Sequence, residues 1–253
     1  MTSFLDLHVP GDPLLIPNPW DAGSAGLFEA LGARALATTS SGFAASLGHA
    51  DSDVTLDQVL HHCQLVCDAV DIPVSADLEN GYVAGDPGPT YAAAAATGLA
   101  GASIEDWSGS EIYPLADAVD RVRAARAAAP GLVLTGRAEG RLRGDESLPS
   151  LVERLNAYAE AGADVLYAPV VTDLDELTTL VKEVSRPVNA LLLPGMTIPS
   201  LADAGIARIS VGGQLAWAAW NGAAEAARSF LSGSVDWLPS AGAGRKAAGL
   251  VID

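Results

Sequence analysis

Short apolar runs rich in leucine or β-branched residues alternate along this chain with longer, alanine-rich amphipathic stretches, and the alternation repeats about eight times. A short apolar run is typical of a strand buried on both faces, and a longer amphipathic stretch predicts a helix. The pattern predicts strands at 14–16, 35–39, 73–77, 101–105, 132–137, 163–168, 188–193 and 207–211. It predicts helices at 22–31, 56–70, 90–98, 115–129, 150–161, 174–184, 198–204 and 213–231.

This alternation predicts an α/β fold with a parallel sheet, and eight strand–helix units favour closure into a (β/α)₈ TIM barrel. Glycines at the expected helix ends support the boundaries, because glycine readily ends a helix: Gly32, Gly98, Gly162 and Gly205. The 253 residues suit a single barrel domain, 1–253. An open doubly wound sheet is the alternative, although the first strand–helix turn lacks the glycine pattern of a dinucleotide site.

The end of the chain, 213–253, departs from the repeat. After the helix at 213–231 comes a tail containing Gly, Ser and Pro, with an apolar stretch at 247–252. That apolar stretch suggests packing on a neighbouring subunit, although a tail that packs on its own chain is nearly as good an explanation. We therefore expect a homo-oligomer, a dimer or a tetramer.

A formal net charge of −17 argues against nucleic acid or an anionic membrane as a partner, because both repel such a surface. No apolar run is long enough to span a bilayer, and the N-terminus lacks the form of a signal peptide. We therefore expect a cytoplasmic protein. Cys63 and Cys67 lie one helical turn apart, and we interpret them as packing residues rather than as a soft-metal or redox pair.

Charged residues gather where three consecutive predicted strands end. Asp77 and Glu79 follow one strand, Glu105 ends the next, and Arg137 and Glu139 end the third. Because catalytic residues of a parallel barrel lie at the carboxyl ends of its strands, we expect these side chains on one rim. Converging carboxylates repel one another unless a cation neutralises them, and all-oxygen ligands favour Mg²⁺, with Mn²⁺ as the alternative. Helix capping is the alternative role for such acids.

Small polar residues add candidates for substrate binding. Thr39, Ser40 and Ser41 follow the second strand, where hydroxyl and backbone N–H groups can hold an anion. Arg137 offers a planar fork to a substrate carboxylate. Asn189 lies on the seventh strand, and Asp51 on a loop from which it could reach the metal through water.

Taken together in order, these motifs resemble the isocitrate lyase / phosphoenolpyruvate mutase superfamily. The resemblance implies a barrel in which Asp77, Glu79 and Glu105 hold Mg²⁺, largely through water. It implies that a 2-oxo acid or its enolate is bound by the metal, by Arg137 and by the amides of 39–41, and that the last helix is exchanged within a tetramer. The motifs that carry it are PNPWDAGSA (17–25), TSSG (39–42), DLENGY (77–82), IED (104–106), GRAE (136–139) and PVN (187–189).

The chain departs from this superfamily at two places. The lyases carry a Lys-Lys-Cys-Gly-His stretch after strand 4, whereas the segment here, 107–114, has no Lys, Cys or His. Pro169 stands where the phosphonate enzymes have a histidine, and Ala37 replaces an aromatic residue. The first departure argues against a classical isocitrate or methylisocitrate lyase reaction, and the second weakens a phosphonate mutase reading.

We therefore predict a Mg²⁺-dependent carbon–carbon lyase or decarboxylase that acts on a small 2-oxo or 2-hydroxy dicarboxylate through a metal-stabilised enolate. Arg137 and Glu139 belong to its catalytic set, and the proton comes from Tyr82, Tyr113 or water. A phosphonopyruvate-type mutase or hydrolase is an alternative. A barrel that binds a ligand without turning it over is another.

Overall fold

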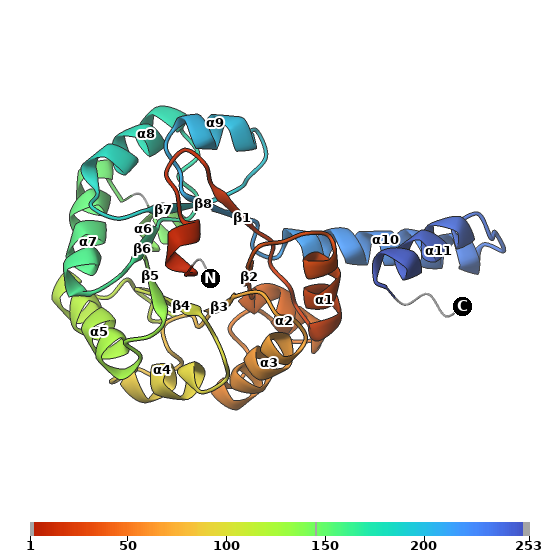
Figure 1. The fold of residues 1–253 in the computed structure, drawn as a ribbon, viewed down its shortest axis with the longest axis horizontal. Coiled ribbons are helices and arrows are strands. Elements are labelled where there is room, and N and C mark those ends of the chain that lie inside the picture. The colour runs from red at the N-terminus through yellow and green to blue at the C-terminus, as the bar shows by residue number, and fades with distance from the viewer. Residues whose placement is uncertain (1–2, 145, 250–253) are drawn as a thin grey trace.

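The computed structural model describes residues 3–144 and 146–249, and it contains one eight-stranded sheet (Figure 1). All the strand pairs are parallel, and the sheet order is β1-β8-β7-β6-β5-β4-β3-β2. From β2 to β8, strands that follow one another in the chain therefore lie side by side in the sheet, and β8 pairs with β1. This order rules out an open doubly wound sheet and confirms the (β/α)₈ barrel. The strands are β1 Leu14–Ile16, β2 Leu36–Ala37, β3 Val74–Asp77, β4 Gly101–Glu105, β5 Val133–Arg137, β6 Val165–Tyr167, β7 Val188–Leu191 and β8 Arg208–Ser210.

A ring of helices surrounds the sheet (Figure 1). Up to residue 203, most of them cover the outer faces of the strands, as the amphipathic pattern predicts. The helices are α1 Ala22–Ala30, α2 Ser40–Ser46, α3 Leu56–Asp68, α4 Gly88–Ala95, α5 Leu115–Ala128, α6 Gly140–Arg143, α7 Leu148–Ala161, α8 Leu174–Glu183, α9 Ile198–Asp203, α10 Gln214–Leu231 and α11 Leu238–Ala247, with a short 3₁₀ helix, η1, at Leu5–Leu7.

The seam between β1 and β2 is closed by the backbone and by one asparagine. The Ala37 amide donates to the Pro17 carbonyl at 3.2 Å. Asn18 is buried, donates from Nδ2 to the Ala37 carbonyl at 2.9 Å, and accepts at Oδ1 from the Val211 amide at 2.8 Å. Because prolines flank Asn18 and lack an N–H, its side chain supplies hydrogen bonds that the strand backbone cannot.

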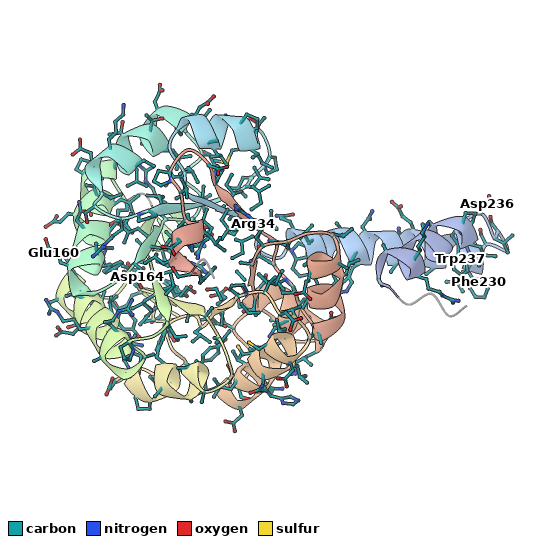
Figure 2. All side chains as sticks on the ribbon, in the orientation of Figure 1. Arg34, Glu160, Asp164, Phe230, Asp236 and Trp237 are labelled. Carbon is teal, nitrogen blue, oxygen red and sulfur yellow. The ribbon has the colours of Figure 1, made fainter. Side chains whose placement is uncertain are left out.

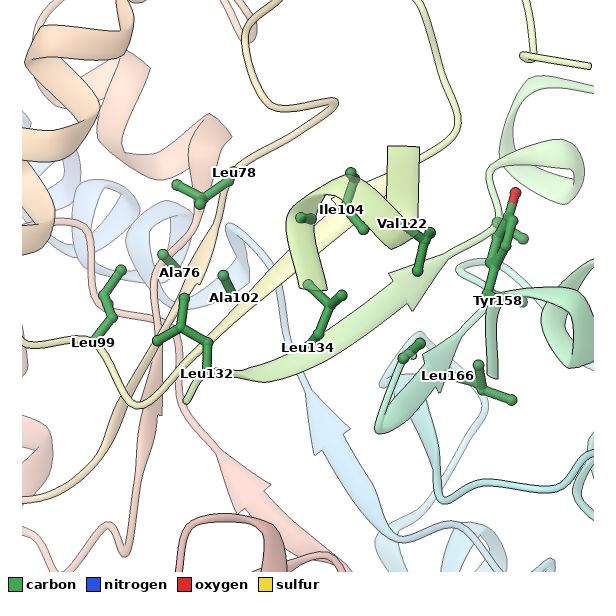
Figure 3. Packing of buried hydrophobic residues seen from close by; sticks show 14 of the residues in the cluster. Ala76, Leu78, Leu99, Ala102, Ile104, Val122, Leu132, Leu134, Tyr158 and Leu166 are labelled. Carbon is green, nitrogen blue, oxygen red and sulfur yellow. The ribbon is translucent and has the colours of Figure 1, made fainter. Parts of the chain in front are cut away.

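Alternation along the strands separates the core from the barrel interior. Ala76, Ala102, Leu134 and Leu166 belong to the main hydrophobic core, which includes Val122 of α5 and Tyr158 of α7 (Figure 3). The residues one position away on each strand face the inside of the barrel. The polar residues of the strand ends therefore share the interior, and the apolar ones support the helices.

The amino end of the barrel is closed by the start of the chain. Phe4 packs with Leu14, Ile16 and Ala35 in a separate small cluster, and η1 lies over the middle of the barrel in Figure 1. A Cβ at Gly101 would meet the Phe4 ring at 2.8 Å, so this strand position requires glycine. Access to the interior is therefore from the carboxyl ends of the strands.

Most predicted boundaries agree with the structure within three residues, and all four helix-ending glycines adopt a positive φ. The strand predicted at 35–39 is wrong at its end: β2 stops at Ala37, and Thr39 instead caps α2 by accepting from the Gly42 amide. The hydrophobic pattern does not predict α2, α6 and α11, because each is short or lies in a segment of weak helix propensity.

The tail is not the loop that its composition suggests. Its described part contains α11, which turns back towards the barrel, and the centroids of the Phe230 and Trp237 rings lie 6.3 Å apart, edge to face (Figures 1 and 2). Both helices project away from the barrel (Figure 1). The last part of the apolar stretch at 247–252 lies outside the described residues.

Cys63 is fully buried in the hydrophobic core, where burial raises the pKa of its thiol to about 12. Cys67 is half-buried and packs against the same core. Both are free thiols, so the interpretation as packing residues agrees with the structure. No helix in the described part of the chain has the length and apolar character needed to cross a membrane.

Candidate active site

A cavity of about 290 Å³ opens at the carboxyl ends of the strands. Its volume is close to the lower end of the range for small-molecule sites. The structure brings seven of the predicted site residues to its wall: Thr39, Ser40, Ser41, Asp51, Asp77, Arg137 and Asn189. Glu79, Glu105 and Glu139 are not among its lining residues but contact Asp77 or Arg137, which are. Tyr82 lies one contact further away, at Glu79.

Arg137 is the centre of the predicted row of acids. Its Nη1 lies 3.6 Å from Asp77 Oδ2 and 3.4 Å from Glu105 Oε2, and its Nε donates to Glu139 Oε1 at 2.5 Å. The register explains this meeting, because Glu105 pairs with Arg137 across β4 and β5. The three strand ends therefore form one charged cluster, as their spacing in the sequence predicts.

Glu139 is fully buried and holds two arginines. Its second oxygen accepts from Arg143 Nε at 3.2 Å, and its backbone amide donates to Asp106 Oδ1 at 2.8 Å. Asp106 is fixed in turn by the Tyr158 hydroxyl at 2.6 Å. These contacts support a positioning role for Glu139, which orients Arg137 towards the cavity.

The turn after β3 aims Asp77 and Glu79 through an unusual backbone. Glu79 and Tyr82 both have positive φ, 47° and 59°, a conformation that residues with a Cβ rarely adopt. The Tyr82 hydroxyl donates to Glu79 Oε1 at 2.9 Å, and Asp77 Oδ1 accepts from the Glu79 amide at 3.3 Å. The backbone conformation of this turn therefore directs the Tyr82 hydroxyl to the Glu79 carboxylate.

Arg121 holds this strained turn in place. It is buried, and its guanidinium donates to the carbonyls of Asn80, Val83, Ala84 and Gly85. One side chain therefore satisfies four backbone acceptors of the turn. Strain of this kind persists only where the surroundings over-determine the backbone, and it is common at functional sites.

Burial makes the charged forms of two predicted metal ligands costly. It raises the pKa of Glu105 to about 8 despite the neighbouring Arg137, and it raises the pKa of Glu79, with Asp77 adding repulsion. No three Asp, Glu, His or Cys side chains within 3–144 and 146–249 converge closely enough to bind an ion directly. The donors are nevertheless all oxygen, which fits a hard ion held mainly through water.

The raised pKa of Glu105 gives a testable dependence of stability on pH. A carboxyl whose pKa is higher in the folded state than the ordinary 4.5 stabilises the fold below that value, and this contribution is lost as the pH rises towards about 8. We expect the metal-free protein to be less stable to urea at pH 8.5 than at pH 6. Glu105→Gln should reduce this difference, and an unchanged difference would show that other groups cause it.

The segments that follow β2 and β8 meet at residues 39–41, the hydroxyl-rich turn. Thr39 Oγ1 lies 3.2 Å from Ser41 Oγ, and a Cβ at Gly213 would meet Ser41 Oγ at 2.8 Å. Thr38, one residue earlier, accepts the Asp77 amide on its hydroxyl at 3.0 Å. The turn therefore lies between Asp77 and the start of α10, with its first amides free of acceptors within the helix.

The segment after β4 is a short, closed turn. Trp107 and Ile112 form an antiparallel bridge, and the Ser108 hydroxyl accepts from the Glu111 amide at 2.9 Å. Arg143 stacks over the Trp107 ring at 4.7 Å. The structure thus has an ordered hairpin where the superfamily lyases carry their reactive stretch.

Several residues that line the cavity were not predicted from the sequence, among them Asn18, Tyr167 and Arg208. Tyr167 lies under Arg137, 5.4 Å from its guanidinium, and burial raises the pKa of its hydroxyl to about 12. Asn18 belongs to a motif that carries the resemblance, so its polarity between two prolines was a usable signal. Arg208 was also visible, as a charge at the start of an otherwise uncharged strand.

A family model for phosphoenolpyruvate phosphomutase matches residues 4–231. The chain belongs to the phosphoenolpyruvate phosphomutase family. This confirms the resemblance to the isocitrate lyase / phosphoenolpyruvate mutase superfamily. Among its relatives, an uncharacterised protein of Mycobacterium tuberculosis is 34% identical over 91% of this chain and 90% of its own. The 2-methylisocitrate lyase of Escherichia coli is 31% identical over 74% of this chain and 71% of its own.

Solved structures of the family have the same fold. A lyase/mutase candidate from Burkholderia cenocepacia superimposes with a TM-score of 0.87 at 41% identity, over 93% of this chain and 89% of that one. A phosphonopyruvate hydrolase in complex with oxalate and Mg²⁺ has a TM-score of 0.82 at 21% identity, over 91% of this chain and 87% of that one. Named proteins with this fold thus include lyases, mutases and hydrolases.

Proposed function

We propose that this family member is a Mg²⁺-dependent carbon–carbon lyase or decarboxylase acting on a small 2-oxo or 2-hydroxy dicarboxylate. The observation that carries the proposal is the Arg137 cluster, in which one cavity-lining guanidinium contacts Asp77, Glu105 and Glu139. Such a cluster places a guanidinium and several carboxylates beside the small cavity. It suits a substrate whose carboxylate pairs with the guanidinium while its oxygens also bind a metal ion held by the carboxylates.

The residues that would hold the ion are Asp77 and Asp51 at the cavity wall, with Glu79 and Glu105 behind them through water. The all-oxygen donors, the raised pKa of Glu79 and Glu105, and the relative solved with Mg²⁺ and oxalate support this assignment. When bound, a divalent ion supplies Lewis-acid polarisation of the 2-oxo group.

The chain's own groups would bind and orient the substrate. Among the described residues, ion pairs engage Nε and Nη1 of Arg137, which leaves Nη2 for a substrate carboxylate. The amides and hydroxyls of 39–41 face the same cavity and favour negative charge on the reacting oxygen. Asn189, held by the Ser210 hydroxyl network, would complete the binding wall.

Proton delivery falls to water or a tyrosine, because no Lys, Cys or His is among the described residues that line the cavity. Tyr82 remains a predicted donor, although its hydroxyl is engaged with Glu79. Tyr113 lies on another surface, with Arg121 4.6 Å above its ring. Among the described residues, Tyr167 is the tyrosine that lines the cavity, and its high pKa keeps it protonated at neutral pH.

A screen of small 2-oxo and 2-hydroxy dicarboxylates with Mg²⁺, followed by proton NMR, tests the proposal. We expect release of pyruvate or glyoxylate, or of carbon dioxide from a β-oxo acid. Phosphorus NMR with phosphonopyruvate tests the alternative of a mutase or hydrolase. If calorimetry shows Mg²⁺-dependent binding of oxalate and no acid is turned over, the protein is a binding barrel and the lyase proposal is wrong.

We also propose that the protein assembles by exchange of α10 between two copies. In a closed barrel the helix after β8 covers β8 and β1, whereas α10 projects away (Figure 1). It leaves an apolar groove of about 650 Å³ whose lining includes Leu15 of β1, Ile209 of β8, Leu31 after α1 and Ile198 of α9. Leu15 and Leu31 are 46% and 69% exposed there.

The occupant that fits this groove is the same helix of a second copy. Large apolar side chains of α10 and the segment after it are exposed, as they would be in an isolated half of an exchanged pair. They are Trp217, Trp220, Phe230, Leu231, Val235 and Leu238. Exchange would cover both these side chains and the groove.

Leu31→Asp should therefore weaken the assembly by placing a charge in the groove. We expect the variant to elute as a smaller species than the wild type at micromolar concentration, measured by size exclusion with light scattering. Leu65→Asp is the matched control, because Leu65 of α3 is also exposed but lies outside the groove. Equal masses for all three proteins would contradict the exchange.

A further inference from the structure

Arg208 is a buried cation without an acidic partner in the described part of the chain. It is 5% exposed, and no described carboxylate forms an ion pair with it. Its Nη1 is buried and has no hydrogen-bond partner among the described residues. An unpaired buried charge is costly, so a protein that keeps one has a use for it.

The side chain is held in one orientation. Arg208 Nε donates to Asn189 Oδ1 at 2.9 Å, and Asn189 Nδ2 donates to Ser210 Oγ at 3.1 Å. All three residues face the barrel interior and line the cavity. The network therefore fixes the guanidinium while leaving Nη1 without an acceptor.

The surroundings supply no counter-ion. His8 lies on the amino-end side of Arg208, and burial together with this arginine lowers the pKa of the histidine to about 4, so it is neutral. Burial lowers the pKa of Arg208 to about 10, which still leaves it charged at neutral pH. The acids among the described cavity residues, Asp51 and Asp77, belong to the β2–β3 side, whereas Arg208 and Asn189 belong to β8 and β7.

We propose that Arg208, oriented by Asn189, is a second anion-binding site in the cavity. It binds the substrate's distal carboxylate, the one that is not attached to the carbon carrying the 2-oxo or 2-hydroxy group. The inference rests on the proposed function and specifies its substrate class. One carboxylate is bound beside Arg137, and the other neutralises Arg208. Monocarboxylic acids leave the buried cation unpaired and bind weakly.

Malate and 2-hydroxybutyrate test this directly, because they differ by a distal carboxylate in place of a methyl group. With Mg²⁺ present, calorimetry should show malate binding to the wild type at least about tenfold more tightly, as expected for a charged hydrogen-bonded pair. Arg208→Gln should bring the two affinities together and leave oxalate binding within about twofold, because oxalate is too short to need the second site. Arg208→Lys should retain part of the preference.

Arg123→Gln, an exposed arginine of α5 outside the cavity, is the control and should change none of these affinities. The wild-type preference is readable even if a variant does not fold, and its absence overturns the inference. An equal loss of oxalate and malate affinity in a folded Arg208→Gln variant also overturns it, because that result indicates a structural role. Failure of the wild type to bind oxalate with Mg²⁺ instead counts against the proposed function.

Discussion

Replacing Asp77 by alanine is expected to abolish Mg²⁺-dependent binding of oxalate. Asp77 is the proposed metal ligand that reaches the cavity from the strand ends, and its Oδ2 lies 3.6 Å from Arg137. Loss of a residue that merely orients a metal ligand already costs about 10- to 100-fold in affinity. We therefore expect a loss of more than about 100-fold, measured by calorimetry with and without Mg²⁺, together with loss of any turnover.

The fold should survive this change, because the Asp77 side chain contributes only a 3.3 Å hydrogen bond from the Glu79 amide to the turn, and other groups hold the backbone. Its amide donates to the Thr38 hydroxyl, and Arg121 holds the following turn. Asp120→Ala is the control, since Asp120 is an exposed acid of α5 that pairs with Arg123. If Asp77→Ala keeps Mg²⁺-dependent oxalate binding, the metal site is not at these carboxylates.

The barrel was predictable because eight short, mainly apolar runs alternate with longer stretches that are apolar on one face. β4 was predicted at its observed bounds, Gly101–Glu105, since glycine and the charged pair that begins with Glu105 mark its ends. The end of β2 was not, because Thr38 and Thr39 suit a strand by propensity but use their hydroxyls for Asp77 and the cap of α2. The pattern of apolar and polar residues does not show that a side-chain hydroxyl will compete with strand hydrogen bonding in this way.

The rim of charges was also predictable, because a spacing of about one strand–helix unit and strand alternation place Asp77, Glu105 and Arg137 inside the barrel at one end. The degree to which each of these side chains is buried was not predictable from the sequence. Glu139 is fully buried between two arginines, and the positive φ of Glu79 and Tyr82 determines where the tyrosine hydroxyl points. Both depend on contacts between segments far apart in the sequence.

The second large effect is expected for Arg137→Met, which removes the cation at the centre of the site. Glu139 and Glu105 are 0% and 7% exposed, and the change would leave Glu105 and Asp77 without their opposite charge. Breaking a buried ion pair from one side costs about 3–5 kcal/mol of folding stability. Urea unfolding of the metal-free protein at pH 8 should show a loss of this order, and kcat/KM should fall by more than about 1,000-fold.

The pH dependence of Arg137→Met separates electrostatics from packing. Arg137 lowers the pKa of Glu105, so its loss raises that pKa further, and the destabilisation should shrink at pH 6 as Glu105 takes up a proton. Adding Glu105→Gln to Arg137→Met should recover part of the stability but none of the activity. Arg137→Lys keeps the charge without the planar fork, so it should be more stable than Arg137→Met while remaining poorly active. If Arg137→Met lowers the free energy of unfolding equally at pH 6 and pH 8, Arg137 stabilises the fold through its volume. The charges of the cluster would then not be what holds the site together.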